Sequence, residues 1–112
     1  LIDMPPGTGD SYLTIFNELS VDHFILITSS NKLSISDSKR TISMLNKLDI
    51  NILGYIENNI FDMSNSGNDN LFPKDDIHKL GTFKFNKNMY DFDPSYNNPD
   101  NKDIIIKIEN II

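Results

Sequence analysis

The first ten residues constrain the fold more than any other stretch of the chain: Leu-Ile-Asp-Met-Pro-Pro-Gly-Thr-Gly-Asp. The opening apolar pair is typical of the end of a buried strand, and the acidic Asp3 follows it directly. Two prolines then fix φ angles in the loop, whereas Gly7 and Gly9 let its backbone approach a ligand closely. Asp10 is a favourable helix N-cap, so free backbone N–H groups are expected beside the acid. The stretch therefore predicts a strand end, a stiff loop and a helix start.

Helical and strand patterns alternate along the rest of the chain. Apolar residues recur at helical spacing in some segments, and a continuous apolar run over 23–28 is typical of a parallel strand buried on both faces. The predicted elements are a helix over 10–20, a strand over 23–28, a helix from Ser34, strands over 50–56 and 80–86, and a terminal helix after Asp100 or Asn101. The isoleucines of the terminal segment leave a strand open there. This alternation predicts an α/β fold.

The second predicted helix carries a start signal and an apolar stripe. Ser34 and Asp37 have the spacing of a capping box, with the shorter acid in place of glutamate. The stripe is formed by Ile35, Ile42, Leu45 and Leu48, and the basic residues Lys39, Arg40 and Lys47 lie off it. Asp37 is therefore expected to cap the helix.

Residues 60–79 are polar and irregular, and 64–70 contain almost no apolar side chain. Such composition predicts a mobile loop over 60–79. The segment 90–99 is rich in turn residues.

The composition excludes several classes of function. The formal net charge is −6, which argues against nucleic-acid binding through a basic face. No apolar run approaches the roughly 18–20 residues that a membrane span needs, and a cytoplasmic protein is expected. The chain contains no cysteine, so it offers no disulfide and no thiolate ligand. His23 and His78 lack partners at metal-ligand spacing, and no metal site is assigned to them.

Three motifs together resemble one family. The opening stretch resembles the I-D-x-P-P-G-T-G-D signature of the Mrp-type ATPases, which are iron–sulfur cluster carriers in the MinD/ParA group of P-loop NTPases. Ser34, Asp37 and Arg40 match the family's S-x-x-D-x-x-R pattern, and residues 54–59 are similar to its G-V-V-E-N-M motif. The resemblance is good over 1–59 and loose over 60–112.

The resemblance implies a partial doubly wound, mostly parallel sheet of the P-loop NTPase type. It also implies ATP binding and slow hydrolysis by a homodimer that delivers iron–sulfur clusters to client proteins. By match to the signature, Asp3 would hold Mg²⁺ through water, and Gly7 and its neighbours would sense the γ-phosphate through backbone N–H groups. Asp10 would cap the following helix or order the attacking water. Asn58 would contact adenine through its carboxamide, which offers a donor and an acceptor side by side.

The chain departs from the family pattern in informative ways. It has no G-x-x-x-x-G-K-[ST] loop, a motif that lies upstream of the signature in the family. Residues 1–112 are therefore expected to be the C-terminal part of a single P-loop NTPase domain, inactive alone but part of an ATPase. The C-x-x-C pair that many family members carry after the E-N motif is missing, so no cluster ligands are assigned, and Lys84 replaces a usual proline.

Two alternatives remain open on the sequence. The chain could be a non-catalytic interaction module, or it could belong to a MinD/ParA-type positioning ATPase. A positioning ATPase of the MinD type would end in a basic amphipathic helix, whereas Lys102 and Lys107 are balanced here by Asp103 and Glu109.

Overall fold

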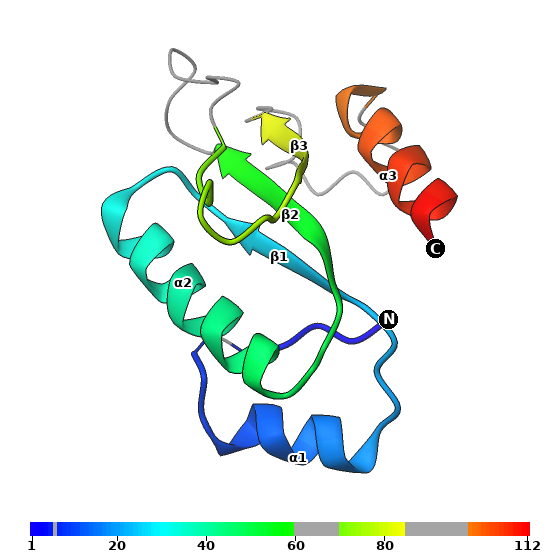
Figure 1. Cartoon of the computed structure of the whole chain (residues 1–112). Coiled ribbons are helices and arrows are strands. Elements are labelled where there is room, and N and C mark those ends of the chain that lie inside the picture. The colour runs from blue at the N-terminus through cyan, green and yellow to red at the C-terminus, as the bar shows by residue number, and fades with distance from the viewer. Residues whose placement is uncertain (6, 60–69, 85–98) are drawn as a thin grey trace.

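The computed structural model places three strands in one parallel sheet with helices on both faces (Figure 1). It describes residues 1–5, 7–59, 70–84 and 99–112, without the side chains of residues 59, 84 and 99–101. The elements follow in the order α1 (Asp10–Glu18), β1 (Phe24–Thr28), α2 (Lys32–Lys47), β2 (Ile52–Asn59), β3 (Lys79–Lys84) and α3 (Pro99–Ile111). The strand order is β1-β2-β3. The predicted α/β fold with a partial parallel sheet is confirmed.

Two apolar clusters cover the two faces of the sheet. Residues that alternate along a strand point to opposite faces, so Tyr55 and Ile56 in β2 enter different clusters. On the α2 side the buried set is Leu26, Ile42, Tyr55, Phe72 and Ile77. On the α3 side it is Ile56, Leu80 and Ile104. Figure 1 shows α2 and α3 on opposite sides of the strands.

Two glycines allow close packing around β3. Gly54 has φ +155, and a Cβ added there would lie 2.6 Å from the carbonyl oxygen of His78. At Gly81 an added Cβ would lie 2.5 Å from the Ile104 side chain of α3. Small residues at these two points therefore let β3 approach β2 and let α3 approach the sheet.

The predicted strand end at the start of the chain is wrong for this structure. Residues 1–5 have no regular secondary structure, and Leu1 is fully exposed. A strand needs a neighbour for its backbone groups, and the described sheet consists only of β1, β2 and β3. Residue 6 lies outside the described residues.

The expectation that the strand over 23–28 is buried on both faces is also wrong. Leu26 and Thr28 are buried beneath α2, but Ile27 on the other face is 53% exposed. The reason is that α3 packs against β3 and leaves the outer face of β1 uncovered among the described residues.

Helix starts differ from the predicted caps. Gly9, not Asp10, is the N-cap of α1, and no side-chain cap bond is made there. The N-cap of α2 is Asn31, whose side chain accepts a hydrogen bond from the Ser34 backbone N–H at 2.8 Å. Asp37 is instead an exposed partner of Arg40, 3.2 Å away. The Asn31 carboxamide lies three residues before Ser34, the spacing that N-capping requires.

The later elements follow the prediction with shifted bounds. β2 extends through Asn59 rather than ending at Ile56, because residues 57–59 pair with residues 82–84 of β3. The terminal segment is a helix, and it begins at Pro99, before either predicted cap. Proline suits the first turn of a helix because its missing N–H has no partner there.

The segment between β2 and β3 contains a packed part. Residues 70–78 follow the part that lies outside the described residues, 60–69, and they bury Phe72 and Ile77 in the α2-side cluster. The predicted loop over 60–79 therefore includes core residues. Predictions for 85–86 and 90–98 fall outside the described residues. None of the described helices is long and apolar enough to cross a membrane.

Candidate functional site

A buried polar layer lies at the carboxyl ends of β1 and β2 on the α2 side. Thr28 is in register with Glu57 across the two strands. The Ser38 hydroxyl of α2 donates to Oγ1 of Thr28 at 2.8 Å, and all three residues are buried. The carboxyl ends of parallel strands are where open α/β sheets bind ligands, so this edge is the natural place for a site.

Glu57 carries the charge of this layer. Its side chain is 3% exposed, and its Oε2 accepts a hydrogen bond from Nζ of Lys79, the first residue of β3. A buried carboxylate without a partner would be strongly destabilising. Glu57 was not among the predicted site residues, because the strand predicted over 50–56 ended just before it, whereas β2 extends through Asn59.

Asn58, the predicted adenine contact, lies within β2 rather than after it. Its Cα pairs with that of Phe83, and the residue is half-buried. Because neighbouring residues in a strand face opposite ways, Asn58 lies on the α3 side, next to but facing away from Glu57.

Hydroxyl and amide groups join the end of β1 to the start of α2. The Ser29 hydroxyl donates to Oγ of Ser34 at 2.7 Å, and the Asn31 amide donates to Oγ of Ser29 at 2.7 Å. Through these contacts the polar side chains of the turn form hydrogen bonds with one another, and these bonds hold the first turn of α2 in place.

The predicted magnesium and phosphate residues lie in the N-terminal segment. Asp3 is exposed, and Gly7 has φ +97 with no atom within 4 Å of an added Cβ. Asp10 is the first residue of α1, where a carboxylate interacts favourably with the helix dipole. Its carbonyl oxygen accepts a hydrogen bond from the Thr14 hydroxyl at 3.0 Å.

The structure does not bring this segment next to Asn58. In Figure 1 the dark-blue N-terminal segment starts near the beginning of β1 and passes the C-terminal end of α2. The arrowheads of β2 and β3 point to the other side of the view. Asp3, Gly7 and Asp10 are close together in the sequence. Asn58, near the end of β2, lies away from the segment that contains them.

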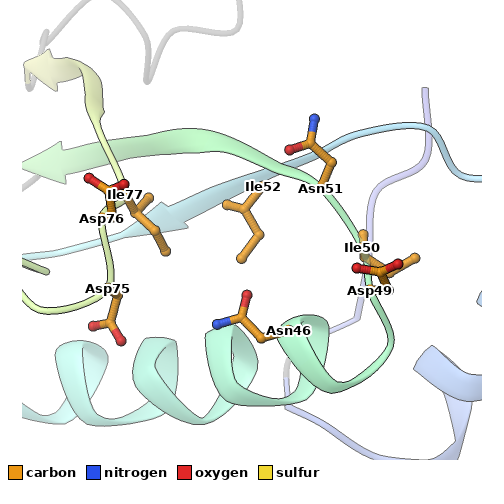
Figure 2. Close-up of a pocket in the computed structure, with 8 residues that line it drawn as sticks. All are labelled: Asn46, Asp49, Ile50, Asn51, Ile52, Asp75, Asp76 and Ile77. Carbon is orange, nitrogen blue, oxygen red and sulfur yellow. The ribbon is translucent and has the colours of Figure 1, made fainter.

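A shallow hollow of about 380 Å³ opens at the amino end of β2 (Figure 2). Its lining is Asn46, Asp49, Ile50, Asn51, Ile52, Asp75, Asp76 and Ile77. Figure 2 shows Asp75 and Asp49 at opposite ends of the hollow. Among the described residues no group of three metal-ligating side chains forms, here or elsewhere. The hollow is at the edge of the sheet opposite to the buried polar layer, and it contains none of the predicted site residues.

A comparison with known families gives a match that extends over most of the chain. A family model described as ParA, NUBPL iron-transfer P-loop NTPase, matches residues 1–89. This range includes the opening signature, α2 and the Glu57–Asn58 segment.

Three curated relatives with the same name are similar to this chain. The iron–sulfur cluster carrier protein of Rickettsia conorii is 40% identical over 77 residues, which are 69% of this chain and 24% of the relative. The protein of that name from Pseudomonas fragi is 36% identical over 84 residues, 73% of this chain and 29% of the relative. That of Methanocaldococcus jannaschii is 46% identical over 59 residues, 52% of this chain and 20% of the relative. The matched part thus spans less than a third of each relative.

Proposed function

The chain belongs to the ParA/NUBPL family of iron-transfer P-loop NTPases, and from this membership we propose that it is part of an ATP-dependent iron–sulfur cluster carrier. The observation that carries the proposal is the family match over residues 1–89, which contains every residue assigned to the nucleotide. The name shared by the relatives supports the cluster as cargo and other iron–sulfur proteins as clients.

The residues present suit a nucleotide with Mg²⁺. Asp3 offers an exposed carboxylate, and hard oxygen ligands are what Mg²⁺ prefers. Gly7 adopts a positive φ, and the space beside its missing Cβ is open, so its backbone can approach a phosphate. Asn58 offers both a donor and an acceptor to a base edge. When bound, Mg²⁺ neutralises charge on the phosphates and so favours transfer of the terminal phosphoryl group.

Each residue has one proposed task. Asp3 holds the water shell of Mg²⁺, and the backbone N–H groups around Gly7 contact the γ-phosphate. Asp10 stabilises the first turn of α1, or orients the attacking water. Asn58 contacts the adenine edge. No cysteine occurs among the 112 residues, so thiolate ligands for a cluster must come from outside this chain.

The site also needs sequence outside the chain. The relatives are more than three times as long as the part matched, which leaves room for a phosphate loop and for further strands. Pairing of residues 1–5 with such a strand would bury the exposed Leu1 and Ile2. The proposed domain is therefore one P-loop NTPase domain of which this chain forms a part, acting as a homodimer.

A positioning ATPase is a weaker candidate. Its membrane helix would require a basic face, whereas α3 carries Lys102, Asp103, Lys107 and Glu109 in balance.

The test is ATP hydrolysis by a longer protein that joins this chain to its upstream phosphate loop. We expect Asp3→Asn to abolish turnover without unfolding the protein, because the charge that organises Mg²⁺ is lost while the side-chain volume is kept. The matched control is Asp22→Asn, which changes another exposed aspartate. Turnover in Asp3→Asn within about threefold of the unchanged protein, a barrier change of about 0.7 kcal/mol, would refute the role of Asp3.

A further inference from the structure

Glu57 and Lys79 depend on each other for their place in the fold. Among the described residues Glu57 is the only charged member of the buried set, and the Lys79 side chain is 18% exposed. Removing the Lys79 charge leaves the Glu57 carboxylate in a water-poor environment, where the loss of its cationic partner is costly. The pair therefore restrains both side chains more tightly than the exposed Asp37–Arg40 pair on α2, whose side chains are 60% and 72% exposed.

The ion pair joins the two ends of the segment that connects β2 to β3. Glu57 lies near the end of β2, and Lys79 is the first residue of β3. Two further contacts hold the returning chain: the Tyr55 N–H donates to the His78 carbonyl at 2.9 Å, and the Leu71 N–H donates to the Tyr55 hydroxyl oxygen at 3.0 Å. Of these contacts, the ion pair is the one next to Asn58 in the sequence.

The geometry links this pair to the proposed base contact. Glu57 and Asn58 share a peptide in β2, and their side chains leave on opposite faces of the sheet. The ion pair that holds Glu57 on the α2 side therefore restrains the backbone at Asn58, and with it the direction in which the Asn58 side chain points. We propose that Glu57 and Lys79 are a positioning pair that sets the direction of the Asn58 carboxamide toward adenine, an inference that rests on the proposed role of Asn58.

The first test needs no nucleotide and uses the chain itself. The NMR signal of the Asn58 side-chain amide, identified by its loss in Asn58→Asp, reports the environment of the carboxamide. We expect Glu57→Gln and Lys79→Met to shift and broaden this signal, because each removes the ion pair. Lys79→Arg, which can still pair with the carboxylate, should keep the signal close to its original position.

The matched control is Asp37→Asn, which removes the exposed ion pair of α2 and should leave the Asn58 signal unchanged. If a single variant fails to fold, the double variant Glu57→Gln/Lys79→Met replaces it, because it removes both charges of the ion pair together. An unchanged Asn58 signal in folded variants would overturn the proposal. A double variant that also fails to fold would assign the pair to fold stability alone and would overturn it as well.

The second test uses the longer protein that carries the phosphate loop. We expect Lys79→Met to weaken ATP binding by about tenfold and to change the affinity for inorganic triphosphate by less than about twofold. Equal weakening of both ligands would overturn the positioning role. An unchanged protein that binds no ATP would instead refute the proposed function, and the amide measurement would still decide whether the pair positions Asn58.

Discussion

Gly54 has no room for a side chain, and its nearest neighbour is a backbone atom, the His78 carbonyl oxygen. Its φ of +155 is unfavourable for any L-residue, and an added Cβ would overlap the His78 carbonyl oxygen and the Leu80 side chain. We expect Gly54→Ala to lower the free energy of unfolding by about 2–4 kcal/mol, measured by urea denaturation. Gly9→Ala is the control, because an added Cβ there meets nothing within 4 Å. Equal losses for the two variants would show that contacts at Gly54 do not matter.

Because of Tyr12, the free energy of unfolding is expected to fall as the pH rises into the alkaline range. Its side chain is buried, with its ring centroid 6.1 Å from that of Phe16 and 6.5 Å from that of Phe24. Burial raises the pKa of Tyr12 above its ordinary value of 10.0. The neutral phenol is thus favoured in the folded state, so its stabilisation is complete below pH 10 and is lost as the pH rises through the raised pKa.

We therefore expect Tyr12→Phe to lose less stability than the unchanged chain when the pH is raised above 10. The measurement is urea denaturation of both proteins at a series of pH values from neutral to alkaline. Parallel pH dependence of the two proteins would show that the Tyr12 hydroxyl does not titrate differently in the folded and unfolded states.

The family resemblance supplied the site candidates, whose roles stay predictions, and it did not include Glu57. Asn58 was singled out by its motif, but nothing in the sequence showed that β2 continues through it. That continuation depends on pairing with residues 82–84, a contact between segments more than twenty residues apart. Glu57 was missed because its partner Lys79 is equally distant along the chain.

The start of α2 shows how local signals can compete at the scale of one element. Both Asn31 and Ser34 are good N-caps, and the Ser34–Asp37 spacing favoured the later start. The structure starts the helix at Lys32, after the Asn31 cap, and so adds helical residues before Ser34. The apolar stripe was predicted correctly, with Ile42 and Leu45 buried, because helical periodicity does not depend on where the helix begins.

We expect Asn31→Ala to lower the free energy of unfolding by about 1 kcal/mol, because it removes the acceptor for the Ser34 N–H. Ser36→Ala, at an exposed position inside α2, should change the stability by less than about 0.5 kcal/mol. Thermal unfolding followed by circular dichroism would measure both. If the two substitutions had the same effect, the hydrogen bond to Asn31 would contribute nothing to the helix.

At the scale of the whole molecule, the alternation of strands and helices predicted the α/β class, and the family resemblance predicted the parallel sheet. The apolar run over 23–28 predicted that both faces of this strand would be covered, and that prediction was wrong. Ile27 is exposed because α3 packs over β3, and residues 1–5 and 7–9 lie outside the sheet. Both features depend on which elements meet in space, and an apolar run in the sequence does not specify its partner.

The complete absence of cysteine leads to a prediction for the whole chain. Iron in a cluster is held by thiolates, and none is available among the 112 residues. We expect anaerobic incubation with iron and sulfide, followed by desalting, to leave no stoichiometric iron and no visible absorption band. A cysteine-bearing ferredoxin treated in parallel is the control. A stable coloured product on this chain would show that its oxygen and nitrogen donors can hold a cluster.

The contact between Tyr55 and Phe72 should give a near-ultraviolet circular dichroism signal that reports on their packing. The two rings meet edge to face, with centroids 5.0 Å apart and planes at 88°, and both residues are fully buried. The chain has no tryptophan, so tyrosine in a fixed asymmetric setting dominates its near-ultraviolet circular dichroism. If residues 70–77 separate from the sheet before the strands unfold, the Tyr55 part of this signal will disappear, while the part from Tyr12 and the far-ultraviolet spectrum persist. Two spectra of one unlabelled sample would then distinguish local opening from global unfolding.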